Sequence, residues 1–200
     1  MHRSFQIDDE TRYFGTMGYI LMDYIDGDNV GDCWKYLTKN QKENIVHQTA
    51  EMIAQLQAID FPIAGLLGGG PCRGRFFTDY SAGPFKDAIE MQNWFNHKLT
   101  ICKYFNQAPK DTPAFEFTKF VLVHQDASPR NMILDKSGTV WFIDWADAGA
   151  YPPAFEPAAM GLQLRFSEFN KMLLDVIPGY TGEVKQLHSI ENGLTVASFP

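Results

Sequence analysis

The chain has 200 residues, 45% hydrophobic and 20% charged, with a formal net charge of −7 and a pI of about 5.1. Its 16 Phe, 8 Tyr and 4 Trp supply enough apolar bulk for one globular core, which excludes wholesale disorder. The acidic balance without a basic stripe argues against a nucleic-acid partner, and the lack of about 18 consecutive apolar residues argues against a membrane span.

The three cysteines, Cys33, Cys72 and Cys102, are widely spaced and form no C-x-x-C pair. This spacing predicts neither a disulfide framework nor a zinc site. The first eight residues turn acidic before any apolar run develops, so they do not read as a signal peptide. We therefore expect a cytoplasmic protein with reduced cysteines.

The N-terminal residues predict a short hairpin. Phe5–Ile7 reads as one strand, residues 8–11 as a polar turn, and Tyr19–Ile25 as a second, mostly buried strand. The run Asp26-Gly27-Asp28-Asn29 should then break the strand, because Gly and Asn tolerate the positive φ angles of turns.

Two long helices are predicted next. Thr38-x-x-Gln41 is a capping-box pattern that opens a helix to about Ile59, with apolar residues repeating at helical spacing. Residues 60–84 hold six Gly and three Pro and are expected to be loop. A second helix is expected over Phe85–Cys102, with four side chains buried: Ile89, Trp94, Phe95 and Leu99.

The second half of the chain predicts a small catalytic hairpin followed by helices. Phe120–Val123 is strand-like, and residues 132–134 and 140–143 should pair across a Lys-Ser-Gly turn. Helix is expected again over Leu162–Val176, whereas the last twenty residues are ambiguous. Helices before and after one small hairpin give a mainly helical α+β fold.

The residues that carry chemistry lie in and after the loop 124–131, which reads His-Gln-Asp-Ala-Ser-Pro-Arg-Asn. Phosphoryl transfer needs a carboxylate to accept the proton of the attacking hydroxyl, and hard oxygen ligands for Mg²⁺. Asp126 suits the base, and Asn131 and Asp144 suit the metal, because the hairpin returns Asp144 towards Asn131. Any of these residues taken singly could instead be a buried, hydrogen-bonded loop residue.

The pattern H-x-D-x-x-x-x-N followed by Ile143-Asp144-Trp145 resembles the aminoglycoside phosphotransferase and choline kinase superfamily. The run Ser128–Leu134, with Ala148-Gly149-Ala150-Tyr151-Pro152, resembles its fungal branch in particular. Residues 19–27 are similar to the last strand and hinge of that family's N-lobe, and Gly83-Pro84-Phe85 to its G-P-F before a helix.

This resemblance implies a protein-kinase-like fold and ATP–Mg²⁺-dependent phosphorylation of a small-molecule hydroxyl. It implies that Asp126 is catalytic, that His124 and Arg130 support the loop, and that Asn131 and Asp144 bind the metal. The nucleotide would lie near the hinge residues Asp23, Tyr24 and Ile25. Gln125 departs from the family, which usually carries Gly at this place.

A second departure is the N-lobe. The family's Gly-rich loop and strand Lys precede the segment that matches Tyr13 onward, so we expect residues 1–28 to be an N-lobe remnant and 29–200 the C-lobe. Three alternatives stay open. The chain retains phosphotransfer with ATP and Mg²⁺, it is a repurposed enzyme that uses Asp126 or His124 for acid–base chemistry without ATP, for example in secondary metabolism, or it is a non-catalytic binding module.

The expected partner is a small molecule, with no nucleic acid and no membrane. The remnant also predicts a self-association surface. Phe5, Ile7, Tyr19 and Leu21 would lack the larger sheet that covers them in an intact kinase, and unpaired strand edges invite association. We therefore expect a homodimer through the N-terminal hairpin.

Overall fold

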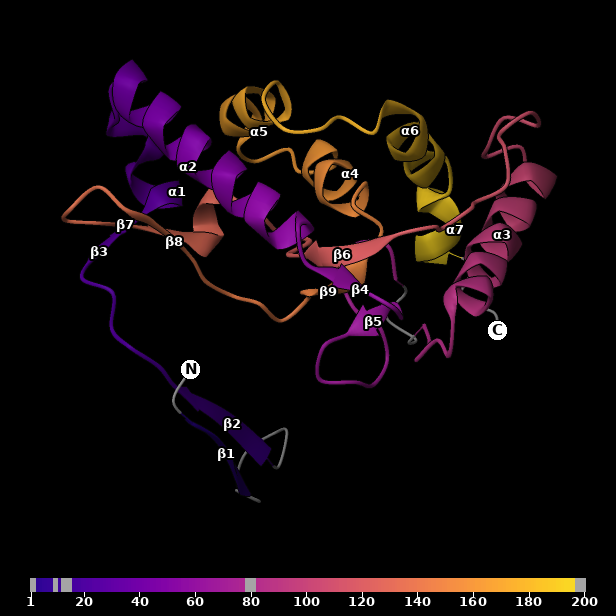
Figure 1. The fold of residues 1–200 in the computed structure, drawn as a ribbon, viewed down its shortest axis with the longest axis horizontal. Coiled ribbons are helices and arrows are strands. Elements are labelled where there is room, and N and C mark those ends of the chain that lie inside the picture. The colour runs from indigo at the N-terminus through magenta and orange to yellow at the C-terminus, as the bar shows by residue number, and fades with distance from the viewer. Residues whose placement is uncertain (1–2, 9–10, 12–15, 78–81, 197–200) are drawn as a thin grey trace.

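The structure is a computed structural model that describes residues 3–8, 11, 16–77 and 82–196. Helices pack over small sheets in one body, and a separate hairpin lies below that body (Figure 1). The helices are α1 (Val30–Cys33), α2 (Lys39–Gln57), α3 (Ala88–Tyr104), α4 (Phe155–Gly161), α5 (Ser167–Leu174), α6 (Thr181–Ser189) and α7 (Glu191–Val196), with 3-10 turns η1 (Trp34–Tyr36) and η2 (Pro129–Asn131). None of the helices in these residues is long and apolar enough to cross a bilayer.

The strands form three sheets. They are β1 (Arg3–Asp8), β2 (Thr16–Leu21), β3 (Gly27–Asn29), β4 (Asp60–Phe61), β5 (Gly65–Leu66), β6 (Phe120–Val123), β7 (Met132–Asp135), β8 (Val140–Phe142) and β9 (Gly149–Tyr151). The sheet orders are β1-β2, β3-β7-β8 and β4-β6-β9-β5. The β7–β8 pairing sets Ile133 opposite Trp141, so the hairpin predicted from the sequence is present.

Two apolar clusters form the core. One surrounds α3 and the four-stranded sheet and includes Phe95 and Phe155, both completely buried. The other lies beneath α2 and includes Ile45 and Met132. Val123, at the end of β6, belongs to the first cluster, and Ala127 belongs to the second. The loop that follows β6 therefore crosses from one cluster to the other and is anchored in both.

The helix predicted from the Thr38-x-x-Gln41 capping box to about Ile59 is confirmed as α2, and its capping box is present. Thr38 accepts from the backbone N–H of Gln41 at 3.4 Å, and the Gln41 side chain accepts from the backbone N–H of Thr38 at 2.8 Å. These two bonds satisfy backbone donors that the first turn of a helix leaves without partners.

The N-terminal predictions need correction. The second strand ends at Leu21 and is exposed rather than mostly buried, because no further layer of the described chain covers it. The run 26–29 does not simply break the chain, because Gly27–Asn29 forms strand β3, which pairs with β7. Glycine is required at 27, since a Cβ there would lie 2.3 Å from the carbonyl oxygen of Leu134. Asp8 of the predicted turn belongs to β1, and residues 9–10 lie outside the described residues.

The hairpin β1–β2 is amphipathic. Its register puts Phe5 opposite Tyr19, and alternation along each strand brings Ile7 and Leu21 to the same face. The Phe5 and Tyr19 rings stack with centroids 5.2 Å apart. These side chains remain 40% to 57% exposed, so this face has no cover within the described chain.

Three further predictions were wrong in detail. The predicted loop 60–84 contains the two-residue strands β4 and β5, while residues 78–81 lie outside the described part. Helix α3 begins after Asp87, which caps it, and Ile89 is 65% exposed instead of buried. The helix expected over Leu162–Val176 is shorter than predicted: α5 starts only at Ser167 and ends at Leu174, and residues 162–166 separate it from α4.

Candidate active site

His124 follows β6 directly and is completely buried. Its Nδ1 lies 3.3 Å from the backbone nitrogen of Asp126, and its Nε2 lies 3.1 Å from the backbone oxygen of Ile143. A backbone N–H can only donate and a carbonyl can only accept, so the ring is the neutral tautomer with its hydrogen on Nε2. Both ring nitrogens are thus engaged in holding the loop to the end of β8.

The Asp126 carboxylate is held by donors from three side chains. Its Oδ2 accepts from Arg130 at 2.5 Å and from Asn131 Nδ2 at 2.8 Å. Its Oδ1 accepts from Gln163 Nε2 at 3.0 Å. Asp126 is half-buried, whereas Arg130 is about half exposed. The carboxylate is therefore fixed in orientation before any substrate arrives.

Asn131 and Asp144 are brought together by the backbone. The N–H of Ile143 donates to the Asn131 carbonyl at 3.0 Å, and Asp144 is the next residue. Asn131 directs its Nδ2 towards Asp126, which leaves its Oδ1 on the opposite side of the amide. Asp144 is exposed and has a φ of +61°, a left-handed conformation that is rare and costly outside glycine.

This donor set suits Mg²⁺ better than a metal that needs a protein cage. Mg²⁺ prefers oxygen ligands and commonly keeps several waters beside one or two carboxylates and substrate phosphates. Asp144 and the amide oxygen of Asn131 provide such a partial set. In the described chain no group of three or more His, Cys, Asp or Glu could hold a metal ion.

Asp147 is an acidic residue of the site that the sequence analysis did not identify. Burial raises the pKa of its carboxyl, and the nearby negative charges of Asp126 and Asp144 raise the pKa further. The positive charge of Arg73 acts in the opposite direction. The carboxyl groups of Asp126, Asp144 and Asp147 thus lie close enough to influence one another electrostatically. In the sequence, only the short spacing between Asp144 and Asp147 could have indicated that Asp147 belongs to the site.

Glu156, at the start of α4, braces the loop from behind. Its Oε2 accepts from the backbone N–H of His124 at 2.7 Å and from that of Gln125 at 3.2 Å. The side chain is 1% exposed, and this burial raises the pKa of its carboxyl. An acidic residue among the apolar residues of Phe155–Met160 was the sequence signal for it.

Gln125, the residue that departs from the family pattern, has a φ of +65°. Glycine adopts this conformation freely, which accounts for its use at this place in the family. Here the Gln125 amide donates to the backbone oxygens of Arg73 at 3.0 Å and Asp147 at 2.7 Å. The side chain therefore ties the loop before α3 to the segment after Asp144.

Gln163 and Asn170 were also missed by sequence reasoning. Gln163 lies in the break between α4 and α5, where a continuous helix was expected. Asn170, buried on α5, donates its Nδ2 to the backbone oxygens of Gln163 at 2.8 Å and of Met160 at 3.3 Å. The break therefore has a fixed shape that brings the Gln163 amide to Asp126.

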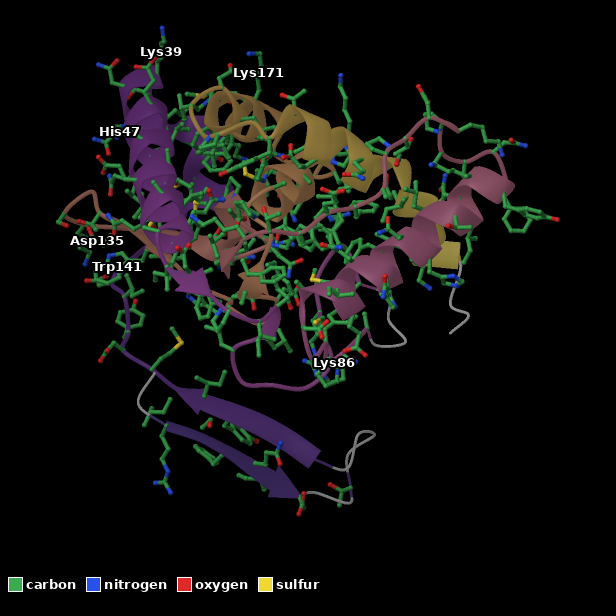
Figure 2. All side chains as sticks on the ribbon, turned by 45° about the vertical axis from the view of Figure 1, so that its right-hand side comes forward. Lys39, His47, Lys86, Asp135, Trp141 and Lys171 are labelled. Atoms are coloured by element: carbon green, nitrogen blue, oxygen red, sulfur yellow. The ribbon has the colours of Figure 1, made fainter. Side chains whose placement is uncertain are left out.

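The hinge residues lie apart from this loop. Asp23, Tyr24 and Ile25 line a concavity of about 580 Å³ together with the β7–β8 turn. Trp141, 47% exposed, donates its Nε1 to Asp135 at 2.8 Å (Figure 2). Hydrogen bonds from Ser137 and Trp141 hold the pKa of Asp135 well below its usual range. Lys136 and Asp26, 2.5 Å apart, join the turn to the hinge segment.

A family model described as a phosphotransferase enzyme family, APH, matches residues 5–180. Solved structures similar to this chain include the gentamicin complex of APH(2'')-IIa, at 16% identity and a TM-score of 0.45, covering 88% of this chain and 59% of that one. The ADP-bound aminoglycoside phosphotransferase APH(2'')-Ib is 18% identical with a TM-score of 0.49, covering 92% and 66%. The chain thus spans roughly three fifths to two thirds of these proteins. No curated protein matches it.

The match over residues 5–180, together with the mixed helix and strand architecture, confirms two predictions from the sequence. The predicted superfamily is right, and so is the α+β, kinase-like fold class. The assignment to the fungal branch, the division at residue 28 and the roles of the individual site residues stay predictions.

Proposed function

Because the chain belongs to the phosphotransferase enzyme family, we propose that it transfers a phosphoryl group from ATP, with Mg²⁺, to a hydroxyl group of a small molecule. One observation carries this proposal. The Asp126 carboxylate is held by Arg130, Asn131 and Gln163 so that its orientation is fixed while part of Oδ1 is left to accept from a substrate. Preorganised positioning of this kind supplies much of the catalysis in phosphoryl transfer.

In this proposal Asp126 orients the attacking hydroxyl and accepts its proton. Arg130 keeps the carboxylate in place, and His124 holds the loop through its two ring nitrogens. Glu156 fixes the backbone of His124 and Gln125 from the opposite side. These residues act on the geometry of Asp126, so their loss should reduce turnover through a displaced carboxylate.

Asn131 and Asp144 would hold Mg²⁺ through oxygen atoms. The chemistry supplied by a metal held there would be positive charge that offsets the negative charge developing on the transferred phosphoryl group. Asp144, exposed and following directly on Ile143, can reach phosphate groups from the end of β8. The adenine base would lie in the concavity between residues 23–25 and the β7–β8 turn, with Trp141 as an exposed aromatic surface.

Acid–base chemistry without ATP is the main alternative from a different class. It would require Asp126 or His124 to carry a proton. Both His124 nitrogens are engaged with backbone groups and the ring is buried, which favours a supporting role over proton transfer. A non-catalytic binding module is the third alternative, and it would not require a charge at either Asp126 or Asp144.

Calorimetric titration of the chain with ATP in the presence of Mg²⁺ tests the proposal directly. Binding is expected for the wild-type chain and for Asp126→Ala. ATP should also quench the fluorescence of Trp141, and the Trp141→Phe variant identifies which part of the fluorescence change comes from this residue. Asp144→Ala should weaken binding at least tenfold, and EDTA should do the same. Asp175→Ala, which removes an exposed carboxylate paired with Lys171, is the matched control.

The proposal is contradicted if ATP does not bind, or if Asp144→Ala and EDTA leave binding unchanged. Turnover of a substrate in EDTA would favour the acid–base alternative instead. A cytoplasmic location and a homodimer formed through the exposed face of β1–β2 belong to the same proposal. The homodimer rests on the uncovered Phe5, Ile7, Tyr19 and Leu21.

A further inference from the structure

The hydrogen bonds of Asp126 restrict where a substrate hydroxyl can bind. A carboxylate offers about four acceptor positions, two on each oxygen. Arg130 and Asn131 take both positions on Oδ2, and Gln163 takes one on Oδ1. The remaining position is on Oδ1, beside the Gln163 amide. A hydroxyl that reaches Asp126 therefore also meets Gln163.

The chemistry of the contact fixes the orientation of that amide. A carboxylate can only accept, so the Gln163 atom that faces Asp126 must be Nε2, and Oε1 points elsewhere. With Nε2 3.0 Å from Oδ1, planar amide geometry puts Oε1 roughly 4–5 Å from the same oxygen. Gln163 is only half-buried, and its Oε1 is not among the buried polar atoms that lack a partner. Asp126 Oδ1 and Gln163 Oε1 are therefore two acceptors separated by roughly 4–5 Å.

We propose that Gln163 is a specificity-determining residue, which accepts a second hydrogen bond from the substrate next to the hydroxyl that Asp126 accepts. Vicinal donors are about 3 Å apart, and each would reach its own acceptor at ordinary hydrogen-bond length. The preferred substrates carry a hydroxyl group on each of two adjacent carbons, that is, a vicinal diol. This inference rests on the proposed role of Asp126 as the residue that binds the reacting hydroxyl.

The segment that carries Gln163 is held well enough to discriminate between substrates. The buried Asn170 side chain donates to the backbone oxygen of Gln163 at 2.8 Å and to that of Met160 at 3.3 Å. Asn170 lies on α5, which packs against α2 and α4 in the core. A substrate lacking the second donor would leave the Gln163 carbonyl without its partner, and losing one such hydrogen bond costs about tenfold in affinity.

Nuclear magnetic resonance of the full chain can test this without turnover. The side-chain amide signal of Gln163 is assigned by its loss in Gln163→Leu. This signal is then followed while cis-1,2-cyclohexanediol or cyclohexanol is added to about 100 mM, a range suited to ligands of millimolar affinity or weaker. The diol should shift this signal and bind at least about tenfold more tightly than the mono-alcohol. In Gln163→Leu the two should bind equally, judged from the backbone signals of Asp126 and Asn131.

Gln186→Leu is the matched control, because Gln186 is also a half-buried glutamine that donates to a backbone oxygen, that of Pro113 at 2.7 Å. It should keep the preference for the diol. Equal binding of the two probes to the wild-type chain, no shift of the Gln163 signal, or a preference retained in Gln163→Leu would each overturn the proposal. Since no ATP is present, failure of the phosphotransfer proposal is seen separately, in the titration with ATP and Mg²⁺.

Discussion

The catalytic loop 124–131 and the hairpin β1–β2 differ in what holds them in place. The loop is held from α4, from β8 and from the break before α5, through Glu156, Ile143 and Gln163. The hairpin is held by its own ladder and by the stacked rings of Phe5 and Tyr19. An isolated two-stranded ribbon is only marginally stable in water. Substitutions in the loop should therefore change turnover, whereas substitutions in the hairpin should change self-association.

The largest expected effect is on turnover at the loop. Asp126→Asn keeps the size of the side chain but removes the base, and it should lower the phosphotransfer rate by about 10²–10⁴-fold. Asp144→Ala should abolish turnover as thoroughly, if it holds the metal. The measurement is ADP release with a vicinal diol substrate. The Phe5→Ser variant should be as active as the wild type. A comparable loss of turnover in that variant would contradict the expected difference between the loop and the hairpin.

A second large effect concerns the stability of the loop. Glu156→Ala leaves the buried N–H groups of His124 and Gln125 without acceptors, and it should lower the free energy of unfolding by about 2–4 kcal/mol. Glu156→Gln keeps an acceptor oxygen and should cost less than half as much. Urea unfolding followed by far-ultraviolet circular dichroism measures both. Similar losses in the two variants would show that the carboxyl group itself, and not merely an acceptor oxygen, is required.

The pH dependence of stability follows from the same residue. Burial raises the pKa of Glu156 in the folded chain above its ordinary value of 4.5, which applies in the unfolded chain. At a pH between the unfolded pKa and the folded pKa, the unfolded chain has released a proton that the folded chain retains. Stability should therefore fall as the pH rises through this window, by up to about 1.4 kcal/mol per pH unit, and level off above the folded pKa. Asp147, whose pKa is also raised, adds a contribution of the same sign.

Glu156→Gln should make this pH profile flatter, because the group that retains the proton is gone. Glu116→Gln, at an exposed site, is the control and should leave the profile as it is in the wild type. Urea midpoints measured from pH 4 to pH 8 provide the comparison. An unchanged slope in Glu156→Gln would mean that another buried group is responsible.

The smallest effect on stability is expected in the hairpin. Phe5→Ser and Tyr19→Ser change exposed side chains and should alter the free energy of unfolding of the body by no more than about 0.5 kcal/mol. They should nevertheless weaken self-association. Light scattering at tens of micromolar, roughly the range for weak dimers, measures this. A wild-type chain that is monomeric there would contradict the proposed homodimer.

The sequence predicted the parts of the site that are local in the chain. Thr38 and Gln41 form a capping box three residues apart, and the hairpin after Asn131 is set by its own turn. The predicted residues Asp126 and Asn131 lie in direct contact. Their spacing within one loop was sufficient to indicate this.

The residues that were missed act across long sequence separations. Glu156 bonds backbone groups 31 and 32 residues before it, and Gln163 bonds Asp126 37 residues before it, so no short spacing in the sequence links them to the loop. The buried second strand and the buried Ile89 were wrong because an apolar side chain does not reveal whether a further layer covers it. β9 was missed since Gly149-Ala150-Tyr151 has little strand propensity of its own.

The contact between Gln125 and Gly74 limits the order in which this protein can change by mutation. A Cβ on Gly74 would lie 2.5 Å from the Gln125 side chain, so the two positions occupy one space although they are 51 residues apart. Gly74 also has a φ of +102°, so a larger residue at 74 would be strained even if 125 had become small. Replacing Gln125 by glycine would remove its hydrogen bonds to the backbone oxygens of Arg73 and Asp147. We expect Gln125 to be retained only in those descendants of this chain that keep glycine at 74.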